Sequence, residues 1–548
     1  MRIKLLRPVD YTFFLKSTQL NTSLLPPYNM AIICSYLRKR GIAIEQDDLN
    51  IRFYHEAYFK NDNINLDALY NKDLVLSYLC GKSVKKIDTL MKEVFKKTGF
   101  LGYDLVLFSS VGYNRELFKE NFLLCACRYI KNHNKCLIGV GGMELNSMKL
   151  FRKFRLMDLL FLGAGEESLY HVIKKLKKGL SAEIDHPNVI DLRQNKLKDK
   201  KPSIGYQLEC PDFDDLPMKL YRWSPHQLFR KKECDMLLLP YSSSIGCPYN
   251  CAFCTESMRK LKVKPVDEVI ADLEFLSKKY DSRHFFFMDN TFNISLNRAK
   301  NLCAKMKDKL DIGWSASVTF TNIDVDCLRL MKEAGCRRLI FGFDSGSKKV
   351  LDIIGKECDL RHAERMLKYA SRIGLWVCLD MITGYPFENE EDFIKTLWFL
   401  DRNSKNINSI CAADFMLLKE SLVEKYPHRY NVKNIKAHKR DNFDWYRPDS
   451  HVLEYEERDG AGWDMVQKKK TSRLRRLNKA AAEHGIVIYE KPVEFEFLQY
   501  IFLMYNSRKD FSKIKKLMRK IYIYNAFKTT VDPSLFIKSI VFRLRKGQ

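Results

Sequence analysis

Three cysteines share one short stretch of the chain, Ser243-Ser244-Ile245-Gly246-Cys247-Pro248-Tyr249-Asn250-Cys251-Ala252-Phe253-Cys254. Their spacing is C-x3-C-x2-C, and the stretch contains no histidine and no fourth cysteine. An apolar run over 236–242, typical of a buried strand, comes directly before it. Because barrels of parallel strands carry their chemistry on the loops that follow the strands, this position predicts a functional loop.

The tight spacing favours a 4Fe-4S cluster on Cys247, Cys251 and Cys254. Such a loop can wrap three thiolates around three irons of a cubane, which leaves the fourth iron open for an exogenous ligand. A structural zinc site fits the spacing less well, since it closes with four ligands, usually from two separated pairs. Three unrelated buried thiols are the remaining alternative, and they would need this triple to arise by chance.

Strand and helix patterns alternate on the carboxyl-terminal side of this loop. We expect helices over 266–279, 324–334 and 359–373. We expect strands over 236–242, 284–288, 314–318, 338–343, 375–382 and 410–417. Six strand and helix units predict a partial (β/α)6, TIM-like barrel over 236–417.

The first 184 residues show a similar alternation, which predicts a parallel, doubly wound, Rossmann-like domain. We expect strands over 3–7, 42–46, 104–109, 136–140 and 159–162, and helices over 28–40, 115–131 and within 61–99. Prolines interrupt the segment 185–235, which we interpret as a linker. Residues 418–548 have mixed character and predict a mostly helical carboxyl-terminal domain that shapes the substrate site.

The composition predicts an α/β protein of several domains that stays in the cytoplasm. An apolar fraction of 46% with 12% aromatic residues is typical of globular proteins, and the chain has 548 residues. Neither a signal peptide nor an apolar run of about 18 residues is found. The net charge of +27 predicts attraction to anions, which include nucleic acid, acidic lipid headgroups and small anionic molecules.

The cysteine loop resembles that of the radical S-adenosylmethionine (radical SAM) superfamily, which has an aromatic residue before the last cysteine, as Phe253 is here. In that family S-adenosylmethionine chelates the open iron, and an electron from the cluster splits it to a 5′-deoxyadenosyl radical. Later stretches resemble the cobalamin-associated branch of the superfamily: FFMDNTF at 286–292, MKEAGC at 331–336, GFDSGS at 342–347 and ITGYPFENE at 382–390.

The resemblance implies an S-adenosylmethionine site on the barrel. Asp289 and Asn290 would lie near the methionyl end, and the backbone at Phe253 and at 382–384, including Gly384, near the adenine. The residues implied near the ribose are Ser315, Ser317, Asp344 and Ser345. The family usually has Glu at position 344, and Asp is one methylene shorter, so that contact would be direct, bridged by water or absent. For each single Ser or Asp, a strand-end or capping residue is the alternative.

The amino-terminal domain resembles the cobalamin-binding domain of the same branch over 103–111, 137–142 and 158–169. The residues implied to line cobalamin are Ser109, Ser110, Gly141, Gly142, Gly165 and Glu166. Adjacent glycines let a cofactor tail pass close to the backbone, although a domain whose glycines only turn the chain is the alternative.

The D-x-H-x-x-G motif of that branch, which supplies a histidine to cobalt, is missing. The resemblance therefore implies cobalamin without a histidine ligand, with its lower face covered by the loop 8–28. The stretch DFDDLP at 212–217 resembles the linker of the same branch.

These features predict a cobalamin-dependent methyltransferase that acts on an unactivated carbon and takes electrons from a low-potential donor such as flavodoxin or ferredoxin. Radical chemistry suits such a carbon, because it offers no proton that a base near neutral pH removes. The substrate, whether small molecule, lipid or peptide, is left open. We do not expect a nucleic-acid partner. A basic amphipathic stretch over 498–544 either touches a membrane or docks on its own domain.

Three rival functions are weighed against this one. An oxidative cyclase or ring-rearranging enzyme would share the architecture. A methylthiotransferase acting on transfer RNA needs three further cluster cysteines in its first domain, and Cys34, Cys80 and Cys125 do not match that spacing. A non-catalytic iron-sulfur or RNA-binding module would have no use for an open iron.

Overall fold

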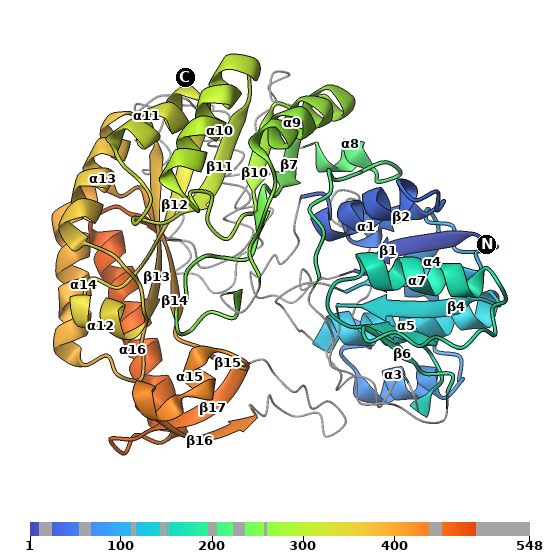
Figure 1. Ribbon diagram of the computed structural model, residues 1–548. Helices are drawn as coiled ribbons and strands as arrows, with labels where there is room; N and C mark the ends of the chain where they lie inside the picture. The colour runs from blue at the N-terminus through green and yellow to red at the C-terminus, as the bar shows by residue number, and fades with distance from the viewer. Residues whose placement is uncertain are drawn as a thin grey trace, which may run out of the picture. The chain divides into compact units, whose positions relative to one another are not determined.

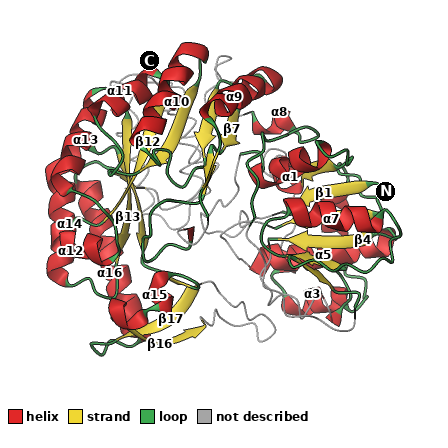
Figure 2. Ribbon diagram, viewed as in Figure 1, coloured by secondary structure: helices red, strands yellow, loops and turns green. Residues whose placement is uncertain are grey.

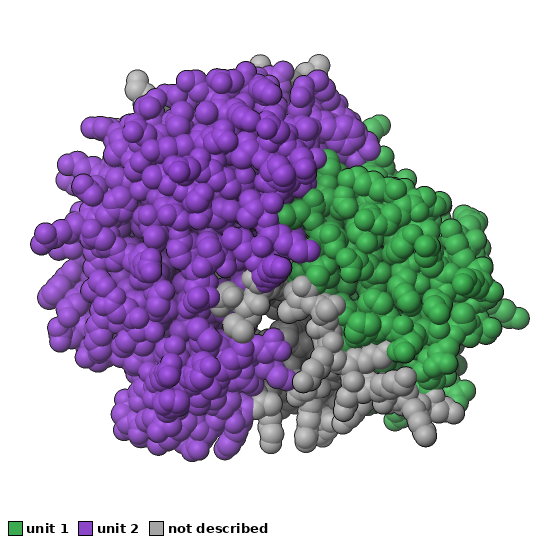
Figure 3. Space-filling model, viewed as in Figure 1, with its two compact units in different colours: residues 1–222, 440–449 green, residues 223–439, 450–548 purple. Residues whose placement is uncertain are grey.

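A computed structural model describes residues 1–9, 25–53, 67–110, 117–142, 151, 153–194, 205–222, 236–256, 260–437 and 452–488. The chain divides into two compact units (Figure 3). Unit 1 comprises residues 1–222 with 440–449, and unit 2 comprises residues 223–439 with 450–548.

Unit 1 contains a six-stranded sheet in the order β2-β1-β3-β4-β5-β6 (Figure 1). The strands are β1 Ile3–Arg7, β2 Glu45–Asp48, β3 Leu105–Ser109, β4 Leu137–Gly141, β5 Leu159–Phe161 and β6 Val189–Asp191. The first five pair in parallel, and β6 is antiparallel to β5. The helices are α1 Tyr28–Arg38, α3 Lys72–Leu79, α4 Lys85–Phe95, α5 Leu117–His133 and α7 Glu166–Leu176, with a short turn, η1, at Asp67–Leu69.

Both faces of this sheet are covered by helices, as a doubly wound fold requires. Along β3, Leu105 and Leu107 belong to one apolar cluster, shared with α1 and α7. Val106 and Phe108 belong to a second cluster, shared with α3, α4 and α5. The alternation follows from the two-residue period of side chains along a strand. The predicted doubly wound domain is confirmed.

Two elements of unit 1 differ from the predictions. The strand expected over 42–46 is β2, Glu45–Asp48, because Ile42 and Ile44 pack into the core before the strand begins. Its side chains are polar because they bind groups outside the apolar core: Gln46 Nε2 donates to the backbone oxygens of Asp212 (2.6 Å) and Asp214 (2.9 Å). The strand β6 lies inside the segment expected as a linker, so part of that segment completes the sheet.

Unit 2 contains a seven-stranded parallel sheet in the order β18-β14-β13-β12-β11-β10-β7. The strands are β7 Leu238–Tyr241, β10 His284–Phe287, β11 Gly313–Val318, β12 Cys336–Asp344, β13 Trp376–Thr383, β14 Ser409–Asp414 and β18 Val487–Ile488. Figure 2 shows helices along the outer face of this curved sheet. They are α9 Val266–Tyr280, α10 Leu296–Lys309, α11 Val325–Glu333, α12 Lys348–Ile353, α13 Leu360–Arg372, α14 Glu390–Asn403 and α16 Trp463–Glu483.

All six strands and all three helices expected for the barrel are present, and the sheet stays open, so the partial barrel is confirmed. Side chains alternate between its two faces. On β13, Leu379 and Met381 are fully buried beneath the helices, whereas Asp380 is exposed on the inner face. The inner face therefore offers accessible groups to a ligand.

The described residues after 417 extend unit 2. A small antiparallel sheet joins β15 Leu417–Leu418, β17 Val452–Glu457 and β16 Val432–Ala437. The strand β18 then pairs in parallel with β14 and adds a seventh strand that the sequence did not predict. The basic stretch 498–544 lies outside the described residues. Within the described part of the chain, no helix is long and apolar enough to cross a membrane.

Candidate functional site

The three-cysteine loop begins where β7 ends, on the inner side of the sheet. Two short strands, β8 Ser244–Ile245 and β9 Lys262–Val263, form an antiparallel pair that brackets the loop. The Ala252 amide donates to the Ile354 carbonyl (2.8 Å), and the Val423 amide donates to the Ala252 carbonyl (3.1 Å). These bonds fix the loop between the end of α12 and the short helix α15, Leu422–Lys425.

The three thiols of the loop, Cys247, Cys251 and Cys254, are half-buried. They are close enough to affect the pKa of one another. Burial raises the pKa of Cys251 to about 12, the neighbouring Cys254 and Cys247 thiols add to the rise, and Lys356 opposes it. Such mutual effects require proximity. Within the described residues, no group of three His, Cys, Asp or Glu is arranged to hold a single metal ion.

A cubane fits this donor set better than zinc does. Its three thiolates bind three different irons and so need not converge on one point. The thiols keep partial exposure, whereas most other described cysteines, such as Cys303 and Cys327, are buried. The residues present thus suit a 4Fe-4S cluster with one open iron.

Asp289, which the resemblance implied near the methionyl end of the cofactor, anchors the cysteine loop. Its buried carboxylate accepts bonds from the Ser243 amide (3.0 Å), the Ser243 hydroxyl (2.7 Å) and the Ser244 hydroxyl (2.5 Å). Burial raises the pKa of Asp289, and these bonds work against that rise. Asp289 therefore ties the end of β10 to the start of the cysteine loop. Asn290 is exposed and donates to Glu256 (3.0 Å).

The serines expected near the ribose separate into two groups. Ser315 and Ser317 are alternate residues of β11, so they share one face of the sheet, and Ser317 is half-buried. Ser345 is fully buried, and its hydroxyl bonds the Thr396 hydroxyl on α14 (3.1 Å) and accepts from the Ser347 amide (3.1 Å). This placement gives Ser345 a structural role and lends no support to a ribose contact.

Asp344 lies where β12 leaves the sheet, with a positive φ of 62° at an irregularity in its pairing with β13. Its carboxylate forms an ion pair with Lys356, and both side chains are largely buried. Lys356 also lies close enough to Cys251 and Cys247 to lower the pKa of both thiols. The sequence analysis did not predict this charge beside the cysteine loop.

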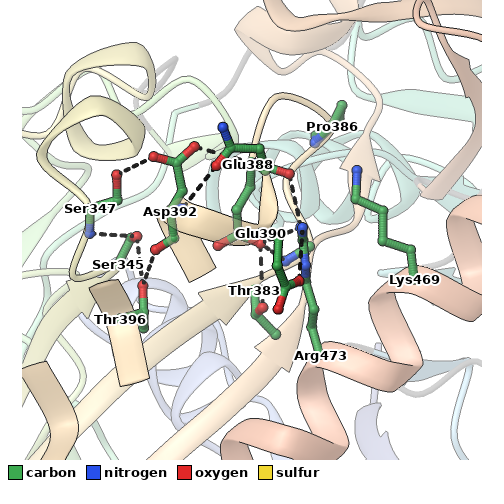
Figure 4. A network of polar contacts seen from close by, with 12 residues as sticks. Ser345, Ser347, Thr383, Pro386, Glu388, Glu390, Asp392, Thr396, Lys469 and Arg473 are labelled. Atoms are coloured by element: carbon green, nitrogen blue, oxygen red, sulfur yellow. Dashed lines mark hydrogen bonds and ion pairs between the residues drawn. The ribbon is translucent and has the colours of Figure 1, made fainter. Parts of the chain in front are cut away.

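The loop after β13, which contains Gly384, is held in place by a side chain of α16. Glu388 Oε2 accepts from the Gly384 amide (2.7 Å). It also accepts from Arg473 Nη1 (2.9 Å), as Figure 4 shows. The Glu388 and Arg473 side chains are only 1% and 6% exposed. Burial raises the pKa of Glu388, and Arg473 opposes the rise. Gly384 has a φ of +80°, and a Cβ there would lie 2.7 Å from Lys470 Cγ.

A second part of the network in Figure 4 joins the loop after β12 to the start of α14. Ser347 Oγ donates to Asp392 Oδ1 (2.7 Å), and Lys349 pairs with Asp392 Oδ2 (2.8 Å). Asn389 and Asp392 form a capping box at the start of α14. The loops after β12 and β13 are therefore both held by side chains outside the inner face.

Asp380 is a site residue that the sequence analysis missed. Burial and the Asp344 charge raise its pKa to about 7, and Lys356 only partly opposes this. The residue is exposed on the inner face, so solvent screening makes the shift smaller than full burial would give. Its sequence signal is a single acid inside the apolar run 375–382.

In unit 1, the expected cobalamin residues gather at the carboxyl edge of the sheet. Ser109 and Gly141 end neighbouring strands, and the Ser110 amide donates to the Gly141 carbonyl (2.8 Å). Gly142 follows with a φ of +79°. Asn29 Nδ2 donates to Ser109 Oγ (2.6 Å), so that hydroxyl already has a partner.

Gly165 and Glu166 begin α7 beside this edge. A Cβ on Gly165 would lie 3.2 Å from Ile33 Cδ1, whereas a Cβ on Gly141 would make only an ordinary contact with Phe161 Cβ at 3.5 Å. Glu166 is buried and accepts from the Gln207 amide (3.4 Å). The space beside Gly141 and the exposed Gly142 suit a ligand that passes along the backbone, as cobalamin would. Residues 10–24, most of the loop expected beneath cobalamin, lie outside the described residues.

Comparisons with known proteins agree with this geometry. The family model of the radical SAM superfamily matches residues 241–400. An uncharacterized methyltransferase of Pyrococcus horikoshii is 28% identical over 387 residues, which are 68% of this chain and 76% of that protein. The radical SAM methyltransferase TsrM of Kitasatospora setae, solved with cobalamin and a [4Fe-4S] cluster bound, matches with a TM-score of 0.53 at 16% identity, over 81% of this chain and 82% of that one.

A third match is the cobalamin-dependent radical SAM enzyme OxsB, solved with aqua-cobalamin and S-adenosylmethionine bound. Its TM-score is 0.57 at 15% identity, over 100% of this chain and 75% of that one. At these identities the solved structures establish a shared fold. Residues 241–400 form a radical SAM domain that contains the three-cysteine loop. The chain therefore carries a radical SAM domain, which supports an enzyme function.

Proposed function

We propose that this chain is a cobalamin-dependent methyltransferase that acts on an unactivated carbon by radical chemistry. The observation that carries the proposal is the pairing of two sites in one chain. Unit 2 holds three half-buried thiols on a loop of a radical SAM domain. Unit 1 holds a doubly wound sheet whose carboxyl edge carries Ser109, Gly141 and Gly142.

The relatives support the same proposal. The Pyrococcus relative is named a methyltransferase, and TsrM, which shares the fold over most of both chains, binds cobalamin and a cluster. When bound, the cluster supplies the electron that splits S-adenosylmethionine, and cobalamin supplies the methyl group. We assign cobalamin a site without a histidine ligand, as the sequence implies.

The residues of the chain prepare the site for this chemistry. Cys247, Cys251 and Cys254 hold the cluster, and Asp289 fixes the loop that carries them. The buried Glu388 and Arg473 pair fixes the backbone of Gly384, where we place the adenine. Asp380, accessible on the inner face, is positioned to meet a polar group of the substrate.

The test is anaerobic purification with iron and cobalamin supplied, followed by reaction with S-adenosylmethionine and a low-potential reductant such as reduced flavodoxin. We expect bound cobalamin in the absorbance spectrum, and both 5′-deoxyadenosine and S-adenosylhomocysteine by mass spectrometry. Protein prepared without cobalamin is the matched control and should form no S-adenosylhomocysteine. Deoxyadenosine alone from the cobalamin-loaded protein would contradict methyl transfer and favour another radical reaction, such as ring formation.

A further inference from the structure

Tyr385 follows Gly384 in the loop after β13 and carries a buried hydroxyl group. Its side chain is 0% exposed. Among the residues that the structure describes, its hydroxyl oxygen has no hydrogen-bond partner. Three aromatic rings hold the phenol ring in place: Phe253 at 6.0 Å, Phe387 at 5.5 Å and Phe415 at 5.2 Å between centroids.

A buried hydroxyl without a partner destabilises a protein, because the group has lost its bonds to water. Most buried polar groups in native proteins have a hydrogen-bond partner, and a bound ligand or a functional role is a usual cause of an exception. Phenylalanine would pack against the same three rings without this penalty. Because the Tyr385 ring also packs against Phe253 of the cysteine loop, we expect that a group bound at that loop supplies the missing acceptor.

The charged groups near the Tyr385 hydroxyl limit which atoms can accept its hydrogen bond. Burial raises the pKa of Tyr385 well above its ordinary value, and the charges of Asp344, Glu388, Cys251 and Asp380 act in the same direction. The phenol therefore stays protonated and serves as a donor. Of these four neighbours, Asp344 is paired with Lys356 and Glu388 with Arg473.

Cys251 differs from the other neighbours because it becomes a cluster ligand in the proposed function. The contact between Phe253 and Tyr385 places the phenol ring against the same loop. Asp380 is exposed on the inner face, where water or substrate can satisfy it. The Cys251 corner of the site is thus the place where loading with iron and sulfide adds new buried acceptors beside the hydroxyl.

We propose that Tyr385 donates a hydrogen bond to a sulfur of the 4Fe-4S cluster at its Cys251 corner, either the thiolate or the adjacent sulfide. This inference rests on the proposed function only in requiring that the cluster is bound. A hydrogen bond to a cluster sulfur stabilises the reduced cluster, which carries one more negative charge, and so raises the reduction potential. Tyr385 is thus a positioning residue that raises the reduction potential of the cluster.

The test replaces Tyr385 with phenylalanine and measures the reduction potential of the cluster by EPR-monitored titration without S-adenosylmethionine. Iron content should match the wild type. The reduction equilibrium should become less favourable by roughly threefold to tenfold, because the bond is present in both oxidation states and only the difference in its strength counts. Tenfold corresponds to about 59 mV for one electron. The thermal stability of the cluster-free variant should equal or exceed that of the wild type.

Tyr455 provides a matched control. It is also buried, its hydroxyl has no partner among the described residues, and its ring contacts Phe415 at 5.9 Å. Tyr455→Phe should leave the potential unchanged. Incorporation of 3-fluorotyrosine at position 385, which makes the phenol a stronger donor, should shift the potential upward.

Two results would overturn the inference. An unchanged potential in the Tyr385→Phe variant, with weaker binding of S-adenosylmethionine, would assign the hydroxyl to the cofactor rather than to the cluster. A loss of stability in the cluster-free variant would show that the hydroxyl has a partner within the protein. If the wild type itself assembles no cluster, the proposed function fails, which is distinguishable from a cluster whose potential does not move.

Discussion

The two parallel sheets of this protein end in chemically different edges. The carboxyl edge of the unit 1 sheet presents Ser109, Gly141 and Gly142, which are small and uncharged. The edge of the unit 2 sheet carries buried charges, among them the pairs Asp344 with Lys356 and Glu388 with Arg473. The two parallel sheets therefore differ at their carboxyl edges. The edge in unit 1 is formed by backbone and small side chains, whereas the edge in unit 2 carries buried ion pairs near the three thiols.

This difference shows which residues at each sheet edge cannot be changed freely. Buried ion pairs contribute little net stability, because desolvation offsets most of their attraction. Their presence beside the cysteine loop and the Gly384 loop is better explained by the need to fix these loops. In unit 1, the edge must instead keep small residues such as Gly141 and Gly142, because a larger side chain would fill the space beside the backbone.

The largest effect should come from the cysteine loop, where Cys251→Ala removes one of the three proposed cluster ligands. Iron content per chain should fall to near zero, and 5′-deoxyadenosine should not form, because two thiolates do not hold the cubane. Cys303, a buried cysteine on α10, is the control, and Cys303→Ala should retain full iron. Retention of iron and of product in the Cys251 variant would contradict the assignment of the loop.

The charged edge of unit 2 can be broken at Glu388. Glu388→Gln leaves the Arg473 guanidinium buried without its carboxylate, which should cost about 3–5 kcal/mol in the free energy of unfolding. The surviving fold should also bind S-adenosylmethionine more weakly, since the Gly384 amide loses its charged acceptor. Denaturant unfolding and equilibrium binding measure the two effects.

Arg476 gives the control for Glu388. It pairs with Glu390, and the side chains are 43% and 54% exposed. Arg476→Gln should therefore change stability by less than about 1 kcal/mol. Equal losses in the two variants would show that burial of the Glu388 pair does not matter.

The uncharged edge of unit 1 can be filled at Gly141. Gly141→Leu should leave the sheet folded, because a Cβ there meets only Phe161 Cβ at an ordinary contact distance. Its side chain should nevertheless occupy the space where we place cobalamin and lower cobalamin binding at least about tenfold, the effect of roughly 1.4 kcal/mol. Lys135→Leu, before the opposite end of β4, is the control, and unchanged binding in both variants would argue against cobalamin at this edge.

The smallest effect concerns the pH dependence of stability through Asp380. Its folded pKa is raised to about 7, while an unfolded Asp has a pKa of about 3.9. The folded protein thus binds the proton more tightly, so the free energy of unfolding should fall as pH rises from about 4 to about 7 and then level off.

Between about pH 4 and about pH 7, the free energy of unfolding should fall less in Asp380→Asn than in the wild type. The difference between the two proteins should be less than about 1 kcal/mol, because solvent reaches the residue. Denaturant unfolding of cluster-free protein at several pH values measures the difference. Asp308→Asn, an exposed acid on α10, should follow the wild type. Parallel curves for wild type and Asp380→Asn would refute the raised pKa.

Local pattern was sufficient to predict most of both sheets. Runs such as β13 and β12 are apolar and uninterrupted, so their strands could be read directly. The strand β18 has only two residues and follows a long helix, so it leaves no recognisable period. The strand β2 is polar, because its side chains bind backbone and charged partners rather than the core.

The site was predictable only where chemistry is local in the sequence. The three thiols lie within eight positions of one another, so their spacing reveals them. Arg473 is 85 positions from Glu388, and only the folded chain brings them together. Asp289 was predicted as a site residue, but the motif did not show that the Ser243 and Ser244 hydroxyls donate hydrogen bonds to its carboxylate.

The most direct test of the central claim is EPR spectroscopy of the reduced, anaerobically reconstituted protein with and without S-adenosylmethionine. If three cysteines hold a cubane with one open iron, the spectrum will show one 4Fe-4S cluster per chain, and its g-values will shift when the cofactor binds. A cluster whose spectrum ignores S-adenosylmethionine, or protein that takes up zinc and no iron, would contradict the account.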